Sequence, residues 1–280
     1  MKTILYATDC SKHDIDILQY AHELCNKLKA SLILLHVYSI PPIQFSTIRP
    51  RKYLSTHAHD EQLNILKEYT TKHIKQNAIK TQIRFEVTEN ISVSDGILSS
   101  IKEVSPDLLL VGMKDDHTAR EMFSGSIAKA LLEKVNCPLL IVPNMQNFKS
   151  IKKIVYATDF EEDDILAIQR LVEIAQPLNA EINIVHIATK DEYAGKDRME
   201  WLKEMLQEKV VYQNITFQMV YQDTVYDGLR SYINSNNADV VALLEREENG
   251  FFKRLFHKDL TKKIESNITI PMLSFNQAHL

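Results

Sequence analysis

The sequence predicts an α/β fold made of two tandem, doubly wound domains, and two observations carry this prediction. Residues 2–9 (KTILYATD) recur almost unchanged as residues 152–159 (KKIVYATD), so the chain contains an internal repeat. Within each copy, strand-like apolar runs alternate with helix-like segments, the order that builds a parallel sheet with helices on both faces. We therefore expect one domain over 1–143 and a second over 151–280, joined by a short polar linker.

The match between the copies continues along the chain. The residues that reappear are Asp14, His36, Asp95, Gly96 and Asp107, matched by Asp164, His186, Asp227, Gly228 and Asp239. The later pairs are closer together in sequence than the earlier ones. The second copy therefore has a shorter middle section.

Periodicity places the elements of the first copy. Five apolar segments are expected as strands of a parallel sheet: 2–8, 32–37, 81–87, 108–112 and 138–142. Ser11 and Asp14 have the spacing of an N-terminal cap, which predicts a helix to Leu28. Further helices are expected over 55–76, over 92–104 with Gly96 in the first turn, and after 125. Each domain is thus expected to be a five-stranded parallel sheet flanked by helices.

Composition restricts the function classes. The 280 residues have 45% hydrophobic and 25% charged side chains and a net charge of −4, so no global basic field attracts nucleic acid or an anionic membrane. Cys10, Cys25 and Cys137 are odd in number and far apart, which argues against a disulfide framework and a thiolate metal site. No apolar run has the length of a signal or a membrane span. We expect a cytoplasmic protein.

Doubly wound sheets bind ligands beyond the carboxyl ends of their strands, where the strand order reverses. This rule points to Ala7, Thr8 and Asp9 after the first strand, to His36 and Val37 on the second, and to Gly112 and Met113 after the fourth. Gly112-Met113-Lys114-Asp115 is followed, nine residues on, by Gly125-Ser126 at the start of the last helix. Bare amides, a hydroxyl and the helix dipole would suit a phosphate there.

These motifs together resemble the universal stress protein family, over nearly the whole chain as a tandem pair. The resemblance implies the adenine nucleotide alpha hydrolase-like fold and an ATP site at Asp9, Val37, Gly112, Gly125 and Ser126, next to Ala7, Thr8 and Met113. Where nucleotide-binding members carry a second motif glycine, this chain has Asp115, whose carboxylate would repel a phosphate unless a cation such as magnesium bridges them.

The resemblance also implies assembly and function. Single-domain members form dimers, so we expect the two repeats to pack about a pseudo-twofold axis through their last strands, with a homodimer left open. The leading hypothesis is a stress-response protein that binds an adenine nucleotide in its first domain as a signal or switch. The alternative is a nucleotide-free interaction protein that acts through domain pairing.

The second copy departs from the nucleotide motif. Leu244 aligns with Gly112, and Lys258-Asp259 aligns with Gly125-Ser126, while Asp159 keeps the place of Asp9. We therefore expect one nucleotide per chain. No phosphate-loop, dinucleotide or catalytic-triad motif is present in the sequence, so a dedicated enzyme is not expected, and slow ATP hydrolysis stays open.

Several residues have simpler interpretations. His36 and His186 are expected to be structural, and Gly96 and Gly228 to follow an aspartate cap at a helix start. His57, His59 and Asp60 look metal-like, but a solvated helix start is favoured. Three basic side chains could reach a phosphate, but an exposed loop is favoured for them: Arg49, Arg51 and Lys52.

Overall fold

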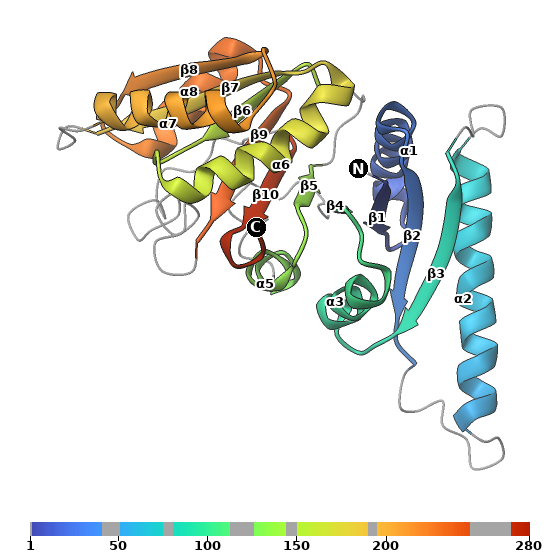
Figure 1. Cartoon of the computed structure of the whole chain (residues 1–280). Helices are drawn as coiled ribbons and strands as arrows, with labels where there is room; N and C mark the ends of the chain where they lie inside the picture. The colour runs from blue at the N-terminus through green and yellow to red at the C-terminus, as the bar shows by residue number, and fades with distance from the viewer. Residues whose placement is uncertain are drawn as a thin grey trace. The chain divides into compact units, whose positions relative to one another are not determined.

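The structure is a computed structural model, and it describes residues 2–40, 51–74, 81–112, 126–143, 150–189, 195–246 and 270–280. The strands are β1 Thr3–Ala7, β2 Ser31–Tyr38, β3 Ile83–Glu89, β4 Leu108–Gly112, β5 Leu139–Val142, β6 Lys153–Ala157, β7 Glu181–Ala188, β8 Ile215–Tyr221, β9 Val240–Glu245 and β10 Met272–Asn276. The helices are η1 Lys12–Asp14, α1 Ile15–Leu28, α2 Arg51–His73, α3 Val93–Val104, α5 Ser126–Lys134, α6 Glu162–Leu178, α7 Gly195–Lys209, α8 Val225–Asn236 and η5 Gln277–His279 (Figure 1).

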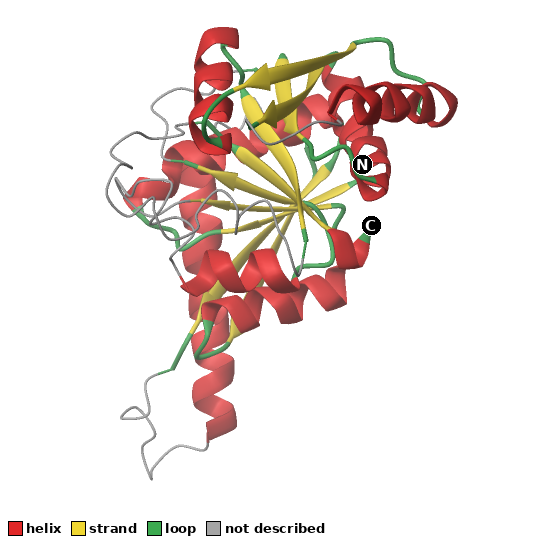
Figure 2. Ribbon diagram, turned by 90° about the vertical axis from the view of Figure 1, so that its left-hand side faces the viewer, coloured by secondary structure: helices red, strands yellow, loops and turns green. Residues whose placement is uncertain are grey.

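The predicted α/β class and the alternation of strands and helices are confirmed. All five strands expected in the first copy exist, with ends within two residues of the prediction. Strand β2 is buried along most of its length because helices cover both faces of a doubly wound sheet. Helices lie on both sides of the strands (Figure 2).

Contacts divide the chain into two compact units. The first contains the described residues up to Gly112, together with 126–137 and 142–143. The second contains Pro138–Ile141 and the described residues from Ser150 to Leu280. Most of β5 is therefore grouped with the second unit, where Met272, Leu273 and Ser274 of β10 pair antiparallel with Ile141, Leu140 and Leu139.

In the first unit, four parallel strands follow the order β3-β2-β1-β4. The register places Ala7 beside Leu35 on one side and beside Val111 on the other. Helix α1 packs against α2, and α3 packs against α5. These helix pairs cover the apolar strands. Tyr6 and Leu34 are fully buried in this core.

The second unit repeats this plan with five parallel strands in the order β10-β9-β6-β7-β8. Ala157 lies beside Val185 and Leu243, as Ala7 lies beside Leu35 and Val111. This register confirms from geometry that Leu244 takes the position of Gly112. The five-stranded parallel sheet expected for the second copy is observed.

Three local predictions were wrong: the cap of the first helix, the start of the second helix, and the caps of the helices that carry Gly96 and Gly228. The Ser11 side chain does not cap the first helix; η1 precedes α1, and the Asp14 side chain accepts a hydrogen bond from Thr8 instead. Helix α2 begins at Arg51, so Arg51 and Lys52 belong to a helix rather than to the expected loop, while Arg49 lies outside the described residues.

The helices that carry Gly96 and Gly228 are capped by Ser92 and Thr224, not by the aspartates. A Cβ added to Gly96 would lie 2.6 Å from Val37 Cγ1, and one added to Gly228 would lie 2.5 Å from Ile187 Cγ2. Both glycines are therefore needed where a helix approaches a strand closely.

Candidate functional site

The strand order reverses in the first unit between β1 and β4. The chain runs from β1 through β2 to β3 on one side, and then crosses to β4 on the other side of β1. Connections that leave in opposite directions make the carboxyl ends of β1 and β4 the preferred ligand position in such a sheet. Because Ala7 pairs with Val111, the segment Thr8-Asp9 and Gly112 lie next to each other at this edge.

A buried polar framework holds the loop that follows β1. Thr8 donates a short hydrogen bond from its hydroxyl to Asp14 Oδ2, and the Tyr6 hydroxyl lies 3.4 Å from the Asp14 carbonyl oxygen, to which it donates. Asp14 is 8% exposed, and this burial raises the pKa of its carboxyl group. Burial also raises the pKa of Tyr6 well above its usual value. These groups are structural and fix the position of the loop.

Asp9 differs from Asp14 because it is exposed at the carboxyl end of β1. Its carboxylate accepts a hydrogen bond of 2.9 Å from the Ser11 amide, which orders the turn. Asp9 is therefore both anchored to the loop and open to solvent, as a ligand-binding acid would be.

Cys10 follows in a left-handed backbone conformation, with φ of 58°. Its amide donates to Thr8 Oγ1 over 3.0 Å. Burial raises the pKa of the Cys10 thiol to about 12, so the sulfur stays protonated at neutral pH. Cys10 therefore lacks the thiolate that a nucleophile needs.

His36 lies beside this turn, near the end of β2. The distance from its Nδ1 to the Thr8 carbonyl oxygen is 2.9 Å, so Nδ1 carries the hydrogen and donates it. Cys10 Sγ lies 4.0 Å from the same nitrogen. His186 makes the same contact with the Thr158 carbonyl oxygen over 2.7 Å in the second unit. Both histidines thus bond to the main chain in the structural way that the sequence predicted.

Gly112 and Val37, both predicted for the nucleotide site, have packing partners. A Cβ added to Gly112 would lie 2.5 Å from Ile17 Cδ1 and 2.8 Å from Asp14 Oδ1. Val37 is half-buried and contacts Gly96 of α3 closely. A side chain at Gly112 would therefore have to displace the Ile17 and Asp14 side chains, whatever binds beyond the strand.

The structure brings together Ala7, Thr8, Asp9 and Gly112, with Val37 on the neighbouring strand. Met113, Asp115 and Gly125 lie outside the described residues, as does the side chain of Ser126, the first residue of α5.

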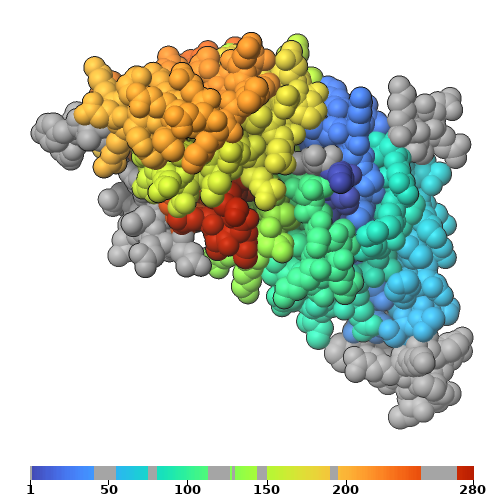
Figure 3. All heavy atoms as spheres, viewed as in Figure 1, coloured from blue at the N-terminus to red at the C-terminus, as the bar shows by residue number. Residues whose placement is uncertain are grey.

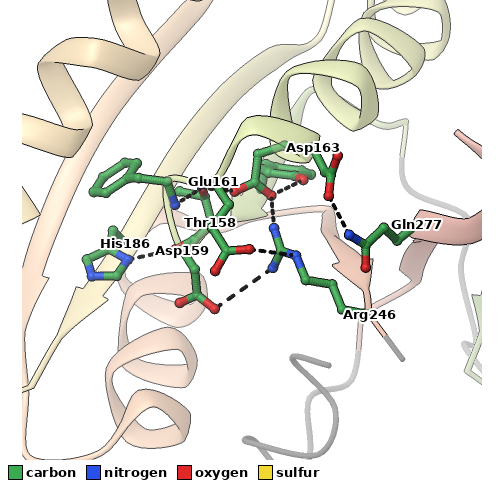
Figure 4. A network of polar contacts seen from close by, with 10 residues as sticks. Thr158, Asp159, Glu161, Asp163, His186, Arg246 and Gln277 are labelled. Carbon is green, nitrogen blue, oxygen red and sulfur yellow. Dashed lines mark hydrogen bonds and ion pairs between the residues drawn. The ribbon is translucent and has the colours of Figure 1, made fainter. Parts of the chain in front are cut away.

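The second unit keeps this framework with one addition. Thr158 and Tyr156 both donate to the Asp164 carboxylate, over 2.7 and 2.8 Å. Arg246, directly after β9, adds a buried guanidinium that contacts Asp164 over 3.1 Å (Figure 4). Arg246 was not predicted from the sequence, although a basic residue directly after a buried strand at the switch point could have indicated it.

The described residues contain no metal-binding cluster and no helix suited to span a membrane. No group of three His, Cys, Asp or Glu side chains among them could hold a metal ion. His57, His59 and Asp60 lie along α2, and the distance between His59 Nδ1 and Asp60 Oδ1 is 3.6 Å. Within the described part of the chain, no helix has both the length and the apolar content of a membrane span.

The fold is a doubly wound α/β fold whose strand order reverses at this edge. The sequence model of the universal stress protein family matches residues 1–143. The chain therefore belongs to the universal stress protein family.

A relative in Bacillus subtilis (strain 168), Universal stress protein YxiE, is 28% identical over 143 residues, which is 50% of this chain and 97% of the relative. Several solved structures with a similar fold span nearly the whole chain, among them the following two. A universal stress protein from Archaeoglobus fulgidus DSM 4304 is 13% identical with a TM-score of 0.64, over 98% of this chain and 96% of that chain. A protein titled Putative Universal Stress Protein, from Pseudomonas aeruginosa UCBPP-PA14, is 13% identical with a TM-score of 0.61, over 100% of this chain and 96% of that chain.

Proposed function

We propose that this protein is a cytoplasmic stress-response protein that binds an adenine nucleotide in its first unit, as a signal or a switch. The observation that carries the proposal is Asp9, an exposed and anchored carboxylate at the carboxyl end of β1, next to Gly112 at the switch point. Asp9 would contact the adenosine, as the family resemblance implies. The phosphates would lie toward Gly125-Ser126 at the start of α5.

Preorganisation supports this proposal. Several hydrogen bonds hold the loop that carries Asp9, among them Thr8 to Asp14, Cys10 to Thr8, Ser11 to Asp9, and His36 to the Thr8 carbonyl oxygen. A loop fixed in this way loses little conformational freedom when a ligand binds. Magnesium would arrive with the phosphates and would offset the charge of Asp115.

Equilibrium dialysis of the full chain with ATP, ADP and AMP, at millimolar concentration with magnesium, tests the proposal. We expect saturation at one nucleotide per chain. Asp9→Ala should weaken binding by about tenfold because a hydrogen bond to a charged group is lost. Gly125→Asp should abolish binding because it places a negative charge beside the phosphates.

Asp16→Asn, on the exposed side of α1, is the matched control and should bind as the wild type does. A second variant, Asp159→Asn, changes the counterpart of Asp9 and tests whether the second unit binds the nucleotide. The absence of saturable binding to the wild type, or two nucleotides per chain, would contradict the proposal.

We propose no dedicated enzymatic activity. Slow ATP hydrolysis would appear as phosphate release above that of a Ser126→Ala variant. Equal rates for the two proteins are expected.

One observation favours the alternative, a nucleotide-free interaction protein. The second unit keeps the polar framework of the first, but a side chain of the protein itself contacts its acidic groups. If the first unit is also closed, purified protein will carry no nucleotide and will not gain thermal stability from any of the three. A nucleotide that copurifies with the chain would exclude this alternative.

A further inference from the structure

Arg246 is a buried arginine at the carboxyl edge of the second sheet. It follows β9 and is 8% exposed. Its guanidinium faces three carboxylates, with Nη2 3.1 Å from Asp164 Oδ1, Nε 3.1 Å from Glu161 Oε2 and Nη1 3.9 Å from Asp159 Oδ2 (Figure 4). All three acids come from the segment between β6 and the first turn of α6. Arg246 thus joins the end of β9 to the start of α6.

The charges in this cluster depend on one another. Burial alone would lower the pKa of Arg246, but the carboxylates of Asp164 and Glu161 outweigh it and raise the pKa above its usual value. The guanidinium is therefore charged at every physiological pH. Asp164 is fully buried and also accepts hydrogen bonds from Tyr156, Thr158 and the Glu161 amide. Without the arginine, a buried carboxylate would lose its cation.

Arg246 lies at the edge of the sheet where doubly wound folds bind their ligands. In the order β10-β9-β6-β7-β8, the switch point lies between β6 and β9, and Arg246 lies beyond the carboxyl end of β9. In the same loop, the Phe160 ring packs on the His186 ring with centroids 4.7 Å apart. The first unit has the smaller Cys10 where the second has Phe160.

We propose that Arg246 is a built-in ligand of the second unit. Its guanidinium occupies an acid-lined position at the switch point, stabilises that unit and closes it to an external ligand. This inference goes beyond the proposed function because it concerns the other unit and does not depend on nucleotide binding in the first.

Trp201 makes the test specific to the second unit. It is the one tryptophan in the sequence, lies on α7 and is 37% exposed. The segment around residue 200 is at the surface of the second unit (Figure 3). Tryptophan fluorescence during heating of the full chain therefore reports unfolding of the second unit alone.

Arg246→Met keeps much of the volume and removes the charge. We expect its fluorescence midpoint to fall by about 10 °C, as when one partner of a buried ion pair is lost from a domain of this size. Arg246→Lys should recover part of this loss because the charge returns without the planar fork. Arg170→Ala, an exposed arginine on α6, is the matched control and should unfold as the wild type does.

Chemical rescue distinguishes a built-in ligand from a packing residue. Arg246→Ala leaves space for a small cation, so about 10 mM methylguanidinium should raise its midpoint, while sodium chloride at equal concentration should not. The wild type should gain nothing from either salt. A midpoint of Arg246→Met equal to that of the wild type, or no rescue of Arg246→Ala, would overturn the proposal.

If Arg246→Ala fails to fold, a compensated variant keeps the test open. Combining Arg246→Met with Asp159→Asn and Glu161→Gln removes two negative charges together with the positive one. We expect this variant to unfold at a higher temperature than Arg246→Met alone, because the buried Asp164 carboxylate then faces fewer neighbouring negative charges. An equal or lower midpoint would show that charge balance does not stabilise the cluster.

Discussion

His22 is a buried histidine on α1, 4% exposed, with an unusual hydrogen-bond arrangement. Its Nδ1 lies 3.5 Å from Asn26 Nδ2, and Asn26 Oδ1 accepts a bond of 2.6 Å from the Thr81 hydroxyl. The amide of Asn26 therefore donates to Nδ1, and the neutral ring carries its hydrogen on Nε2, which has no hydrogen-bond partner among the described residues. Protonation would place a second N–H against the Asn26 donor.

This arrangement predicts acid sensitivity of the first unit. Burial lowers the pKa of His22 below its ordinary value of 6.5, against the smaller opposite effect of Glu23. The unfolded chain then binds the proton more readily than the folded chain does. His22 therefore leaves the free energy of unfolding unchanged above pH 6.5 and lowers it as the pH falls below 6.5. Hydrogen exchange of peptides from α1, followed by mass spectrometry, should show protection decreasing across that range.

The control for this prediction comes from the repeat. Valine occupies the position of His22 in the second copy, at Val172, so His22→Val should remove part of the decrease. Peptides from α6 should not show the histidine effect. Equal acid sensitivity of the wild type and the variant would disprove the assignment to His22.

Gly112 gives a prediction about packing. In Gly112→Ala the new methyl would lie 2.5 Å from Ile17 Cδ1, so we expect a loss of about 1–3 kcal/mol in the free energy of unfolding. Ile17→Val removes that Cδ1 atom and alone costs about 1 kcal/mol. The double variant should lose less than the sum of the two, measured by hydrogen exchange in the first unit. Additive losses would mean that this contact does not require the glycine.

At the scale of the elements, four helices end with a residue in the left-handed conformation, and none of these residues is glycine. They are Lys29, Ser105, Asn179 and Asn237, with φ between 49° and 54°. Asparagine tolerates this conformation better than lysine or serine does. The second copy therefore has the better helix ends of each matched pair.

This asymmetry predicts stabilising substitutions. Lys29→Asn and Ser105→Asn copy the second repeat into the first, and Lys29→Gly should stabilise by about 0.5–1 kcal/mol because glycine adopts positive φ without steric cost. Asn179→Gly should change little by comparison. Urea unfolding followed by far-UV circular dichroism measures these effects, and a destabilised Lys29→Gly variant would contradict the argument.

At the scale of the whole molecule, we predict that the repeats pack about a pseudo-twofold axis through their last strands. Within the second unit, β5 pairs antiparallel with β10, and Leu140 and Leu273 are both buried. Leu140→Lys would bury a charge. We expect it to lower the free energy of unfolding, followed by Trp201 fluorescence, by on the order of 3 kcal/mol. Ile127→Lys, at a position 41% exposed, should have little effect. Small-angle scattering that showed two independent lobes in the wild type would contradict the packing.

The sequence by itself determined the repeat, the order of strands and helices, and the edge of the sheet where Thr8 and Asp9 lie. These properties follow from local periodicity and from the rule that parallel strands need crossovers, which act over short stretches of chain. The aspartates repeated at Asp107 and Asp239 were visible as well, and each accepts hydrogen bonds from the amides at the start of the neighbouring strand.

Only the tertiary structure decided what the individual side chains do. Asp14 was expected to cap a helix but is a buried acceptor for Thr8, and Gly112 was expected to make room for a ligand but also makes room for Ile17. Arg246 contacts acids more than eighty residues earlier in the chain, as its bond to Asp164 shows. Such contacts depend on which segments the sheet brings together and how closely they approach, and no local pattern in the sequence records that distance.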